Sequence, residues 1–121
     1  MSFNGQSFPR ARRLLTSHDF SRVFGGDNHR ASTRYALLLA KTSASDHSRL
    51  GLVIAKKNIR LANQRNRVKR VIREFFRCHP PATHLDLVFL ARKGLGDLSN
   101  DQIRNQLQEL WRKLDKSGQL K

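Results

Sequence analysis

The stretch from Lys56 to Arg77 holds nine basic residues and a single acid, Glu74. Six of the nine are arginines, and a guanidinium group is a planar donor fork that binds a phosphate through two parallel hydrogen bonds. Asn66 lies between two of them, and its amide can donate and accept hydrogen bonds at a ribose or a base edge. The basic residues are Lys56, Lys57, Arg60, Arg65, Arg67, Lys69, Arg70, Arg73 and Arg77.

Arg65, Lys69 and Arg73 are spaced four residues apart and would form one row on a helix. Like charges at this spacing destabilise an isolated helix by about 0.2–0.5 kcal/mol per pair. A charge run is often only a solvated face, but such a face normally mixes acids with the basic residues. We therefore predict that this row contacts nucleic-acid phosphates. RNA is favoured over DNA because the segment follows a strand and a basic loop, whereas a DNA recognition helix usually follows another helix.

The residues that could catalyse hydrolysis are dispersed along the sequence. A protein nuclease needs acids converging on metal ions, or histidines placed for acid–base work, and neither the nine acids nor the five histidines cluster. Asp97 and Asp101 flank Ser99, where we expect them to cap a helix. Cys78 and His79 are separated from His84 by two prolines, a poor zinc-site spacing. We predict no catalytic residue, no metal ligand and no cofactor bound by the chain itself.

The composition supports one small domain with a polyanionic partner. The chain has 121 residues and a formal net charge of +15, an excess that a bound polyanion would neutralise. The longest apolar run, Tyr35 to Ala40, is far shorter than the roughly 20 residues of a membrane span. The first residues lack the apolar core of a secretory signal. We therefore expect a cytoplasmic protein, without a membrane partner or an obligate protein partner.

Hydrophobic periodicity predicts the elements that would position the basic stretch. We expect a flexible arm over 1–12, a short helix from Thr16 to Phe24, a polar segment over 27–32 and a tail over 115–121. The predicted strands cover 34–41, 50–55 and 85–91, and the basic helix runs from 61 or 63 to about 77. Ser99 should cap a last helix whose apolar face includes Trp111 in the core. This order predicts an α+β fold, with helices packed on a small sheet.

At these residues the chain resembles the protein subunit of bacterial ribonuclease P. The central match is Arg65-Asn66-Arg67-Val68-Lys69-Arg70 with Arg73, preceded by the strand Gly51-Leu52-Val53-Ile54-Ala55-Lys56-Lys57. The other matches are Arg13-Leu14, Asp19-Phe20-Ser21-Arg22-Val23-Phe24, Ala91-Arg92-Lys93 and Leu110-Trp111-Arg112-Lys113. The resemblance runs from about Arg10 to Leu114, with the motifs in the family's order.

The resemblance implies an α/β sandwich with three helices and a mostly antiparallel sheet of about four strands. It also implies a left-handed βαβ crossover and a fold similar to one domain of a ribosomal protein. The family's enzyme removes the 5′ leader of precursor tRNA by phosphodiester hydrolysis, using an RNA subunit with magnesium that the protein assists.

The resemblance also assigns roles to individual residues. The catalytic RNA would contact Arg65, Asn66, Arg67, Lys69, Arg70 and Arg73, and the leader would contact Phe20 and Phe24. We add Lys56 and Lys57, which follow a strand, and Arg60 to the predicted RNA-binding residues, and Arg13 and Tyr35 to the predicted leader-binding residues. For Phe20 and Phe24 we expect one edge in the core and one facing the leader. Composition alone would equally allow a ribosomal or RNA-chaperone protein. A DNA-binding regulator is disfavoured by the order of the elements.

Overall fold

The computed structural model describes residues 23, 25, 29–42, 48–79 and 85–116. The elements are β1 (His29–Ser32), β2 (Ala36–Thr42), β3 (Arg49–Val53), α2 (Ala62–Cys78), β4 (Leu85–Ala91), a 3-10 turn η2 (Leu95–Asp97) and α3 (Asn100–Lys116). The predicted arm over 1–12 and, apart from Val23, nearly all of the predicted first helix lie outside the described residues. Of the predicted tail over 115–121, the first two residues belong to α3 and the rest lies outside.

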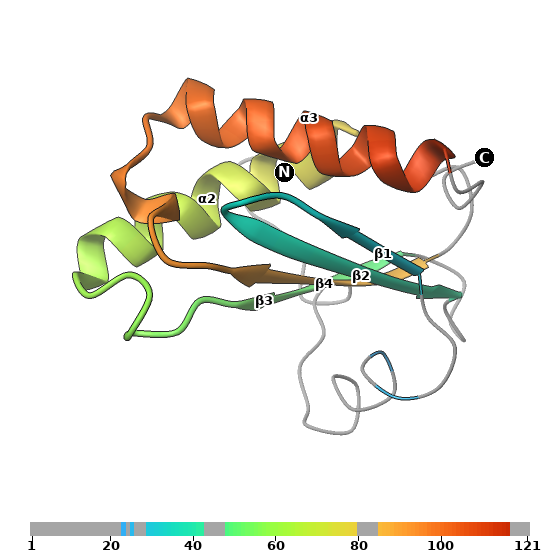
Figure 1. Ribbon diagram of the computed structural model, residues 1–121, viewed down its shortest axis with the longest axis horizontal. Helices are drawn as coiled ribbons and strands as arrows, with labels where there is room; N and C mark the ends of the chain where they lie inside the picture. Colours follow the sequence, from blue (N-terminus) through green and yellow to red (C-terminus); the bar gives the residue numbers. More distant parts are fainter. Residues whose placement is uncertain (1–22, 24, 26–28, 43–47, 80–84, 117–121) are drawn as a thin grey trace, which may run out of the picture.

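The four strands form one mixed sheet in the order β1-β2-β4-β3 (Figure 1). β2 pairs antiparallel with both β1 and β4, while β3 pairs parallel with β4. The chain therefore passes from β3 through α2 to the neighbouring parallel strand β4. This confirms the predicted α+β class, the mostly antiparallel sheet and the βαβ unit; the handedness of the crossover stays a prediction.

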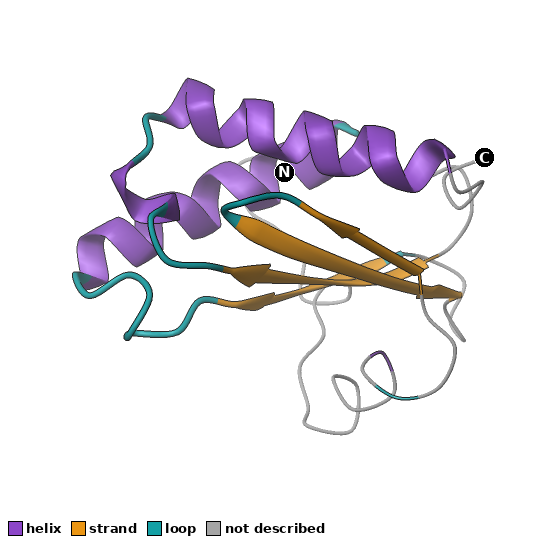
Figure 2. Ribbon diagram, in the orientation of Figure 1, coloured by secondary structure: helices purple, strands orange, loops and turns teal. Residues whose placement is uncertain are grey.

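Both long helices cover the same side of the sheet (Figure 2). Their apolar faces recur at helical spacing and are buried: Val68, Val71, Ile72, Phe75 and Phe76 on α2, and Ile103, Leu107, Leu110 and Leu114 on α3. They share one core with Leu38 of β2 and with Leu87 and Phe89 of β4. Each such side chain contributes about 1.5–3 kcal/mol when fully buried, so the packing of these faces fixes where the basic side of α2 lies.

A second, smaller apolar cluster joins Val23, Leu39 and Val88. Leu39 and Val88 are register partners on β2 and β4. They alternate with the residues of the main core, and successive side chains of a strand point to opposite faces. Val23 is fully buried in this cluster, and half-buried Leu37, Val53 and Leu90 pack around it. The two central strands are therefore buried on both faces.

Three strand predictions need correction. β1 lies in the segment that was described only as polar and in which no strand was predicted. It is an edge strand in which only Ala31 is buried, so it carries no apolar alternation. β2 begins at Ala36 rather than at 34, because the chain turns there with the Thr33 N–H donating to the Ala36 carbonyl at 2.8 Å. β3 ends at Val53 rather than at 55, because the Ala55 carbonyl accepts hydrogen bonds from the following turn.

The predicted cap of the last helix is confirmed. The Ser99 Oγ accepts from the Gln102 N–H at 3.1 Å, and the Gln102 Oε1 accepts from the Ser99 N–H at 2.9 Å. This reciprocal pair is a capping box. Trp111 is only partly buried: it packs edge-on against Phe75 and donates its indole N–H to the His79 carbonyl at 3.0 Å.

Candidate nucleic-acid interface

The lead-in to α2 is a tightly fixed loop. The N–H groups of Asn58 and Ile59 both donate to the Ala55 carbonyl, at 3.0 and 3.1 Å. The Asn58 side chain donates to the Ala91 carbonyl at 2.9 Å, which ties the loop to the end of β4. Ile59 is buried in the main core. The backbone that carries the basic side chains of 56–60 is therefore held from both sides.

Five predicted RNA-binding cations are available on this scaffold. Lys56, Lys57, Arg60 and Arg70 are exposed and Lys69 is half-buried, and within the described residues none of them pairs with a carboxylate. The first turn of α2 contains no acid, and Asn66 is exposed. The acid of the stretch, Glu74, lies 3.8 Å from Arg104 of α3, with both side chains well exposed. The surface thus keeps its positive charge.

Arg65 and Arg67 use their guanidinium groups within the protein. Arg65 Nη1 donates to the carbonyls of Ile59 and Arg60, at 3.0 and 2.9 Å, and so closes the lead-in onto α2. Both of these acceptors are neutral, so the charge of Arg65 is not cancelled. The sequence had predicted only that Arg65 and Arg67 contact phosphates, without these contacts inside the protein.

Arg67 is the more heavily engaged of the two. Its Nε donates to Gln64 Oε1 at 3.0 Å and its Nη1 to Asn100 Oδ1 at 2.7 Å, while its Nη2 donates to the carbonyls of Gly96 and Leu98 at 2.9 and 3.0 Å. Four of the five N–H donors of this guanidinium are thus used. Arg67 joins α2 to η2 and to the start of α3, and a direct phosphate contact by it stays a prediction. Arg73, also in the predicted set, is half-buried and has a partner.

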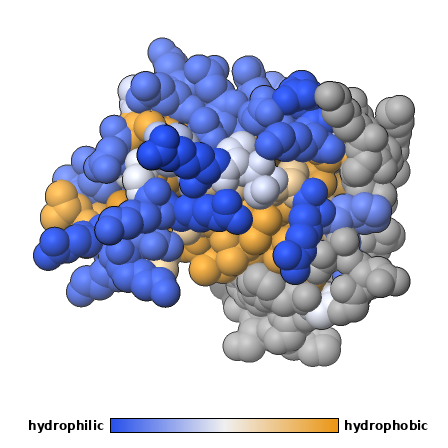
Figure 3. Space-filling view, in the orientation of Figure 1, coloured by the Kyte–Doolittle hydropathy of each residue, from blue (hydrophilic) through white to orange (hydrophobic). Residues whose placement is uncertain are grey.

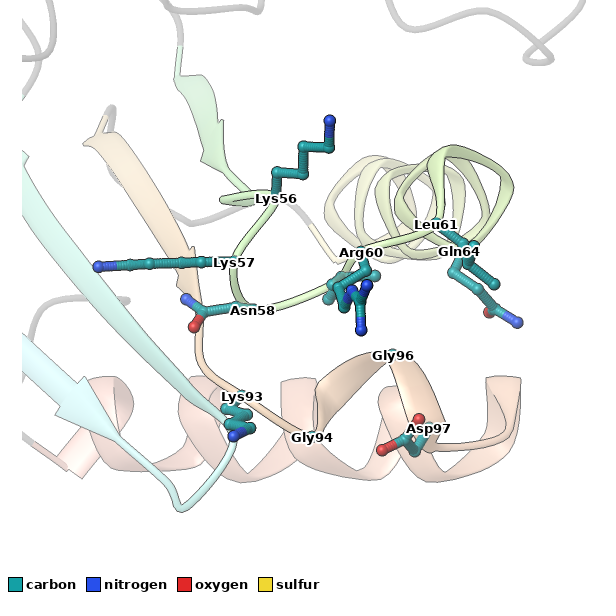
Figure 4. Close-up of a pocket in the computed structure, with 11 residues that line it drawn as sticks. Lys56, Lys57, Asn58, Arg60, Leu61, Gln64, Lys93, Gly94, Gly96 and Asp97 are labelled. Carbon is teal, nitrogen blue, oxygen red and sulfur yellow. The ribbon is translucent and has the colours of Figure 1, made fainter.

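A groove lies between the lead-in to α2 and the turn after β4 (Figure 4). We call it the lead-in groove; it has a volume of about 1040 Å³. Its lining residues are Lys56, Lys57, Asn58, Ile59, Arg60, Leu61, Gln64, Lys93, Gly94, Gly96 and Asp97. Sequence reasoning did not place Lys93 or Asp97 in a site, although Lys93 belongs to a motif that carries the resemblance.

Two glycines allow the turn after β4 to approach Tyr35 and Ile59 closely. Gly94 has a φ of 97°, in the left-handed region that favours glycine, and a Cβ there would lie 3.2 Å from the Tyr35 ring. At Gly96 a Cβ would lie only 2.9 Å from Ile59 Cγ2. The wall of the groove formed by 94–97 therefore depends on the absence of side chains at both positions.

Of the four predicted leader-binding residues, only Tyr35 lies within the described part of the chain. Its half-buried ring packs against Gly94, and the Arg34 guanidinium carbon lies 5.6 Å from the ring centroid. The predicted contacts of Arg13, Phe20 and Phe24 lie outside the described residues. Tyr35 is therefore next to the turn that lines the lead-in groove.

The sheet also carries an ion pair that serves the fold. Asp86 of β4 is fully buried and accepts two hydrogen bonds from Arg49, its register partner on β3, at 3.0 and 2.9 Å. A buried carboxylate needs such a partner. This arginine is thus held by an acid, unlike the five cations on α2 and its lead-in.

The described residues offer little for metal binding or membrane insertion. In residues 23, 25, 29–42, 48–79 and 85–116, no three side chains of His, Cys, Asp or Glu gather where they could hold a metal ion. No helix within those ranges is long and apolar enough to cross a membrane. The visible face of the molecule is mostly hydrophilic, with an apolar area below its centre (Figure 3).

Comparison with known proteins agrees with this geometry. The family model described as Ribonuclease P matches residues 8–115. The chain belongs to the ribonuclease P protein family. It is 49% identical over 111 residues to the ribonuclease P protein component of Pseudomonas aeruginosa, covering 90% of this chain and 82% of the relative. The protein component from Marinobacter nauticus is 44% identical over 110 residues, covering 91% and 83%.

Solved structures of ribonuclease P proteins share the fold. The Staphylococcus aureus protein superposes with a TM-score of 0.79 at 29% identity, covering 93% of this chain and 100% of that one. The Thermotoga maritima protein gives a TM-score of 0.69 at 30% identity, covering 81% and 93%. The resemblance inferred from the motifs is thus confirmed over nearly the whole chain.

Proposed function

We propose that this chain is the protein subunit of ribonuclease P, an endoribonuclease that removes the 5′ leader from precursor tRNA. The observation that carries the proposal is the set of five cations on α2 and its lead-in, Lys56, Lys57, Arg60, Lys69 and Arg70, which lack carboxylate partners among the described residues. Guanidinium and ammonium groups left in this state are suited to phosphates. Membership of the family supports the RNA subunit and precursor tRNA as these polyanions.

The chain contributes binding, not bond cleavage, in this proposal. The catalytic RNA and the leader are both polyanions, and their repulsion opposes docking. A protein of net charge +15 between them lowers that repulsion. We place the catalytic centre and its magnesium on the RNA subunit, as the resemblance to the family implies. The leader would lie near Tyr35 and the predicted contacts Arg13, Phe20 and Phe24.

The position of the cations on a rigid scaffold gives the protein a definite orientation on its RNA. Arg65 and Arg67 fix the loop and the turn on either side of the helix start, so the backbone that carries the exposed cations needs little reordering on binding. Ordering a long side chain costs about 0.5–1.5 kcal/mol at an interface, and a fixed backbone avoids the further cost of ordering a loop. A cytoplasmic location and the absence of an obligate protein partner stay predictions.

Reconstitution tests the proposal directly. The full chain is mixed with a bacterial ribonuclease P RNA and a precursor tRNA at a magnesium concentration where the RNA alone cleaves slowly. We expect faster release of the leader, and no release by the protein without the RNA. Polylysine at equal positive charge serves as the control for bulk charge. No gain over polylysine would reject the proposal and favour a general RNA-binding protein.

A further inference from the structure

The lead-in groove has the size and the charge to hold a nucleotide. Its volume of about 1040 Å³ is at the upper end of the roughly 300–1,000 Å³ of small-ligand sites. Four cations line it, three from the lead-in loop and one from the turn after β4: Lys56, Lys57, Arg60 and Lys93. They come from two segments of the chain (Figure 4), so positive charge borders the groove on two sides.

The groove also has an apolar lining. Leu61 is 62% exposed and is the exposed large hydrophobic residue of the described chain, and Ile59 contributes to the lining beside it. Apolar surface beside several cations suits a ligand that has a flat, poorly hydrated aromatic ring at one end and a phosphate at the other. A nucleotide has this form, and single-stranded RNA presents bases that are splayed out of their stacks.

Asp97 is the feature that a phosphate site alone does not explain. It is an exposed carboxylate in a groove lined by four cations, yet no ion pair or side-chain hydrogen bond engages it within the described residues. The cap of α3 is made by Ser99 and Gln102 instead, so Asp97 does not serve the helix in the way predicted from the sequence. A carboxylate here repels phosphate, and a compensating donor on the ligand would offset that repulsion.

Guanine supplies that donor best. Its Watson–Crick edge carries two adjacent N–H groups, which match the two oxygens of a carboxylate in a bidentate pair. Adenine and cytosine place a ring nitrogen acceptor beside their amino group, and uracil flanks its single N–H with two carbonyls. Each of those acceptors would face the carboxylate oxygens and repel them. The chemistry of the groove therefore discriminates among the bases.

We propose that the lead-in groove binds one unpaired guanosine of an RNA chain, with the adjoining phosphates against its four cations and the guanine edge on Asp97. The inference rests on the proposed function, because an RNA partner supplies the guanosine. Asp97 is a specificity-determining residue in this arrangement. The cations supply affinity for any nucleotide.

Short RNAs test the site in the full-length protein. Amide chemical shifts are followed by NMR during titration with the trinucleotides UGU, UAU, UCU and UUU, and with GMP. We expect UGU to shift the amides of 56–61 and 93–97 and to bind about tenfold more tightly than the other three, as a bidentate base contact does. GMP should bind more weakly than UGU, because it lacks the flanking phosphates.

Two variants with the same charge change separate base reading from charge. Asp97→Asn should bind all four trinucleotides alike, because the amide offers one acceptor and a donor in place of two acceptors. Asp101→Asn is the matched control: this exposed carboxylate contacts Arg104 on α3 and does not line the groove, so the preference for UGU should persist.

Three results would overturn the inference. Equal binding of the four trinucleotides, or a UGU preference that survives in Asp97→Asn, would remove the guanine contact. GMP binding as tight as UGU would reject an RNA chain as the source of the guanosine. Binding of the whole ribonuclease P RNA is measured on the same samples: if it persists, the groove assignment alone has failed, and if it is absent the proposed function has failed as well.

Discussion

Replacing Arg67 with alanine should destabilise the protein much more than the same change at Arg70. The Arg67 guanidinium donates four hydrogen bonds that join α2 to η2 and to the start of α3. Arg70 is exposed and makes no such contacts within the described residues. Both changes remove one positive charge, so they differ only in these contacts.

The expected cost follows from those four bonds. Hydrogen bonds from a charged group contribute about 1.5–3 kcal/mol each when they are protected from water. Arg67 is half-buried, and water can solvate part of the vacated carbonyls of Gly96 and Leu98. We therefore expect the free energy of unfolding to fall by about 2–4 kcal/mol in Arg67→Ala. For a domain of this size the Tm falls by about 4 °C per kcal/mol, which gives a drop of about 8–16 °C.

Thermal unfolding monitored by circular dichroism measures this drop. Arg70→Ala should stay within about 2 °C of the parent protein, since exposed substitutions usually change stability by less than about 0.5 kcal/mol. Arg67→Lys is a further check: it keeps the charge but cannot form the fork, so it should also be destabilised. If Arg67→Ala unfolds at the parent temperature yet loses RNA affinity as Arg70→Ala does, the four hydrogen bonds of Arg67 do not stabilise the fold and Arg67 contacts RNA instead.

Three further predictions concern RNA, the helix cap and the leader. Arg70→Ala should reduce the salt slope of RNA binding by about 1, as loss of one phosphate contact does; an unchanged slope in filter-binding titrations would remove Arg70 from the interface. Ser99→Ala should cost about 1 kcal/mol of stability in urea unfolding by breaking the capping box, with RNA affinity retained; a loss of affinity at constant stability would contradict this. Phe20→Ala should weaken binding of precursor tRNA more than of mature tRNA, and equal losses would exclude a leader contact.

Much of the fold follows from local sequence patterns. α2, β4 and α3 were predicted to within one or two residues of their observed ends, because each carries a strong apolar periodicity. β1 was missed because an edge strand buries little, and in its four residues only Ala31 packs into the core. Its place in the sheet is set by pairing with β2, which no local pattern records.

The candidate site shows the same limit. Spacing along the helix correctly predicted the buried apolar face of α2, and Arg70 and Arg77 lie exposed away from it. It could not show that the carbonyls of Gly96 and Leu98, about thirty residues away, would approach Arg67. Asp97 likewise looked like part of a helix cap, and only the folded turn places it in the lead-in groove. Contacts between segments that are distant in the sequence therefore show which arginines hold the fold together and which cations remain exposed at the surface.

The most direct test of the central claim compares two double variants of equal charge for binding to ribonuclease P RNA. Lys69→Ala/Arg70→Ala removes two cations that lack carboxylate partners among the described residues, and Arg104→Ala/Arg112→Ala removes two from α3 that pair with acids. At a fixed salt concentration we predict that the α2 variant loses RNA affinity at least about tenfold, because a hydrogen bond between charged groups contributes about 1.5–3 kcal/mol. The α3 variant should bind like the parent protein. Equal losses in both variants would contradict the account, because net charge alone would then explain the binding.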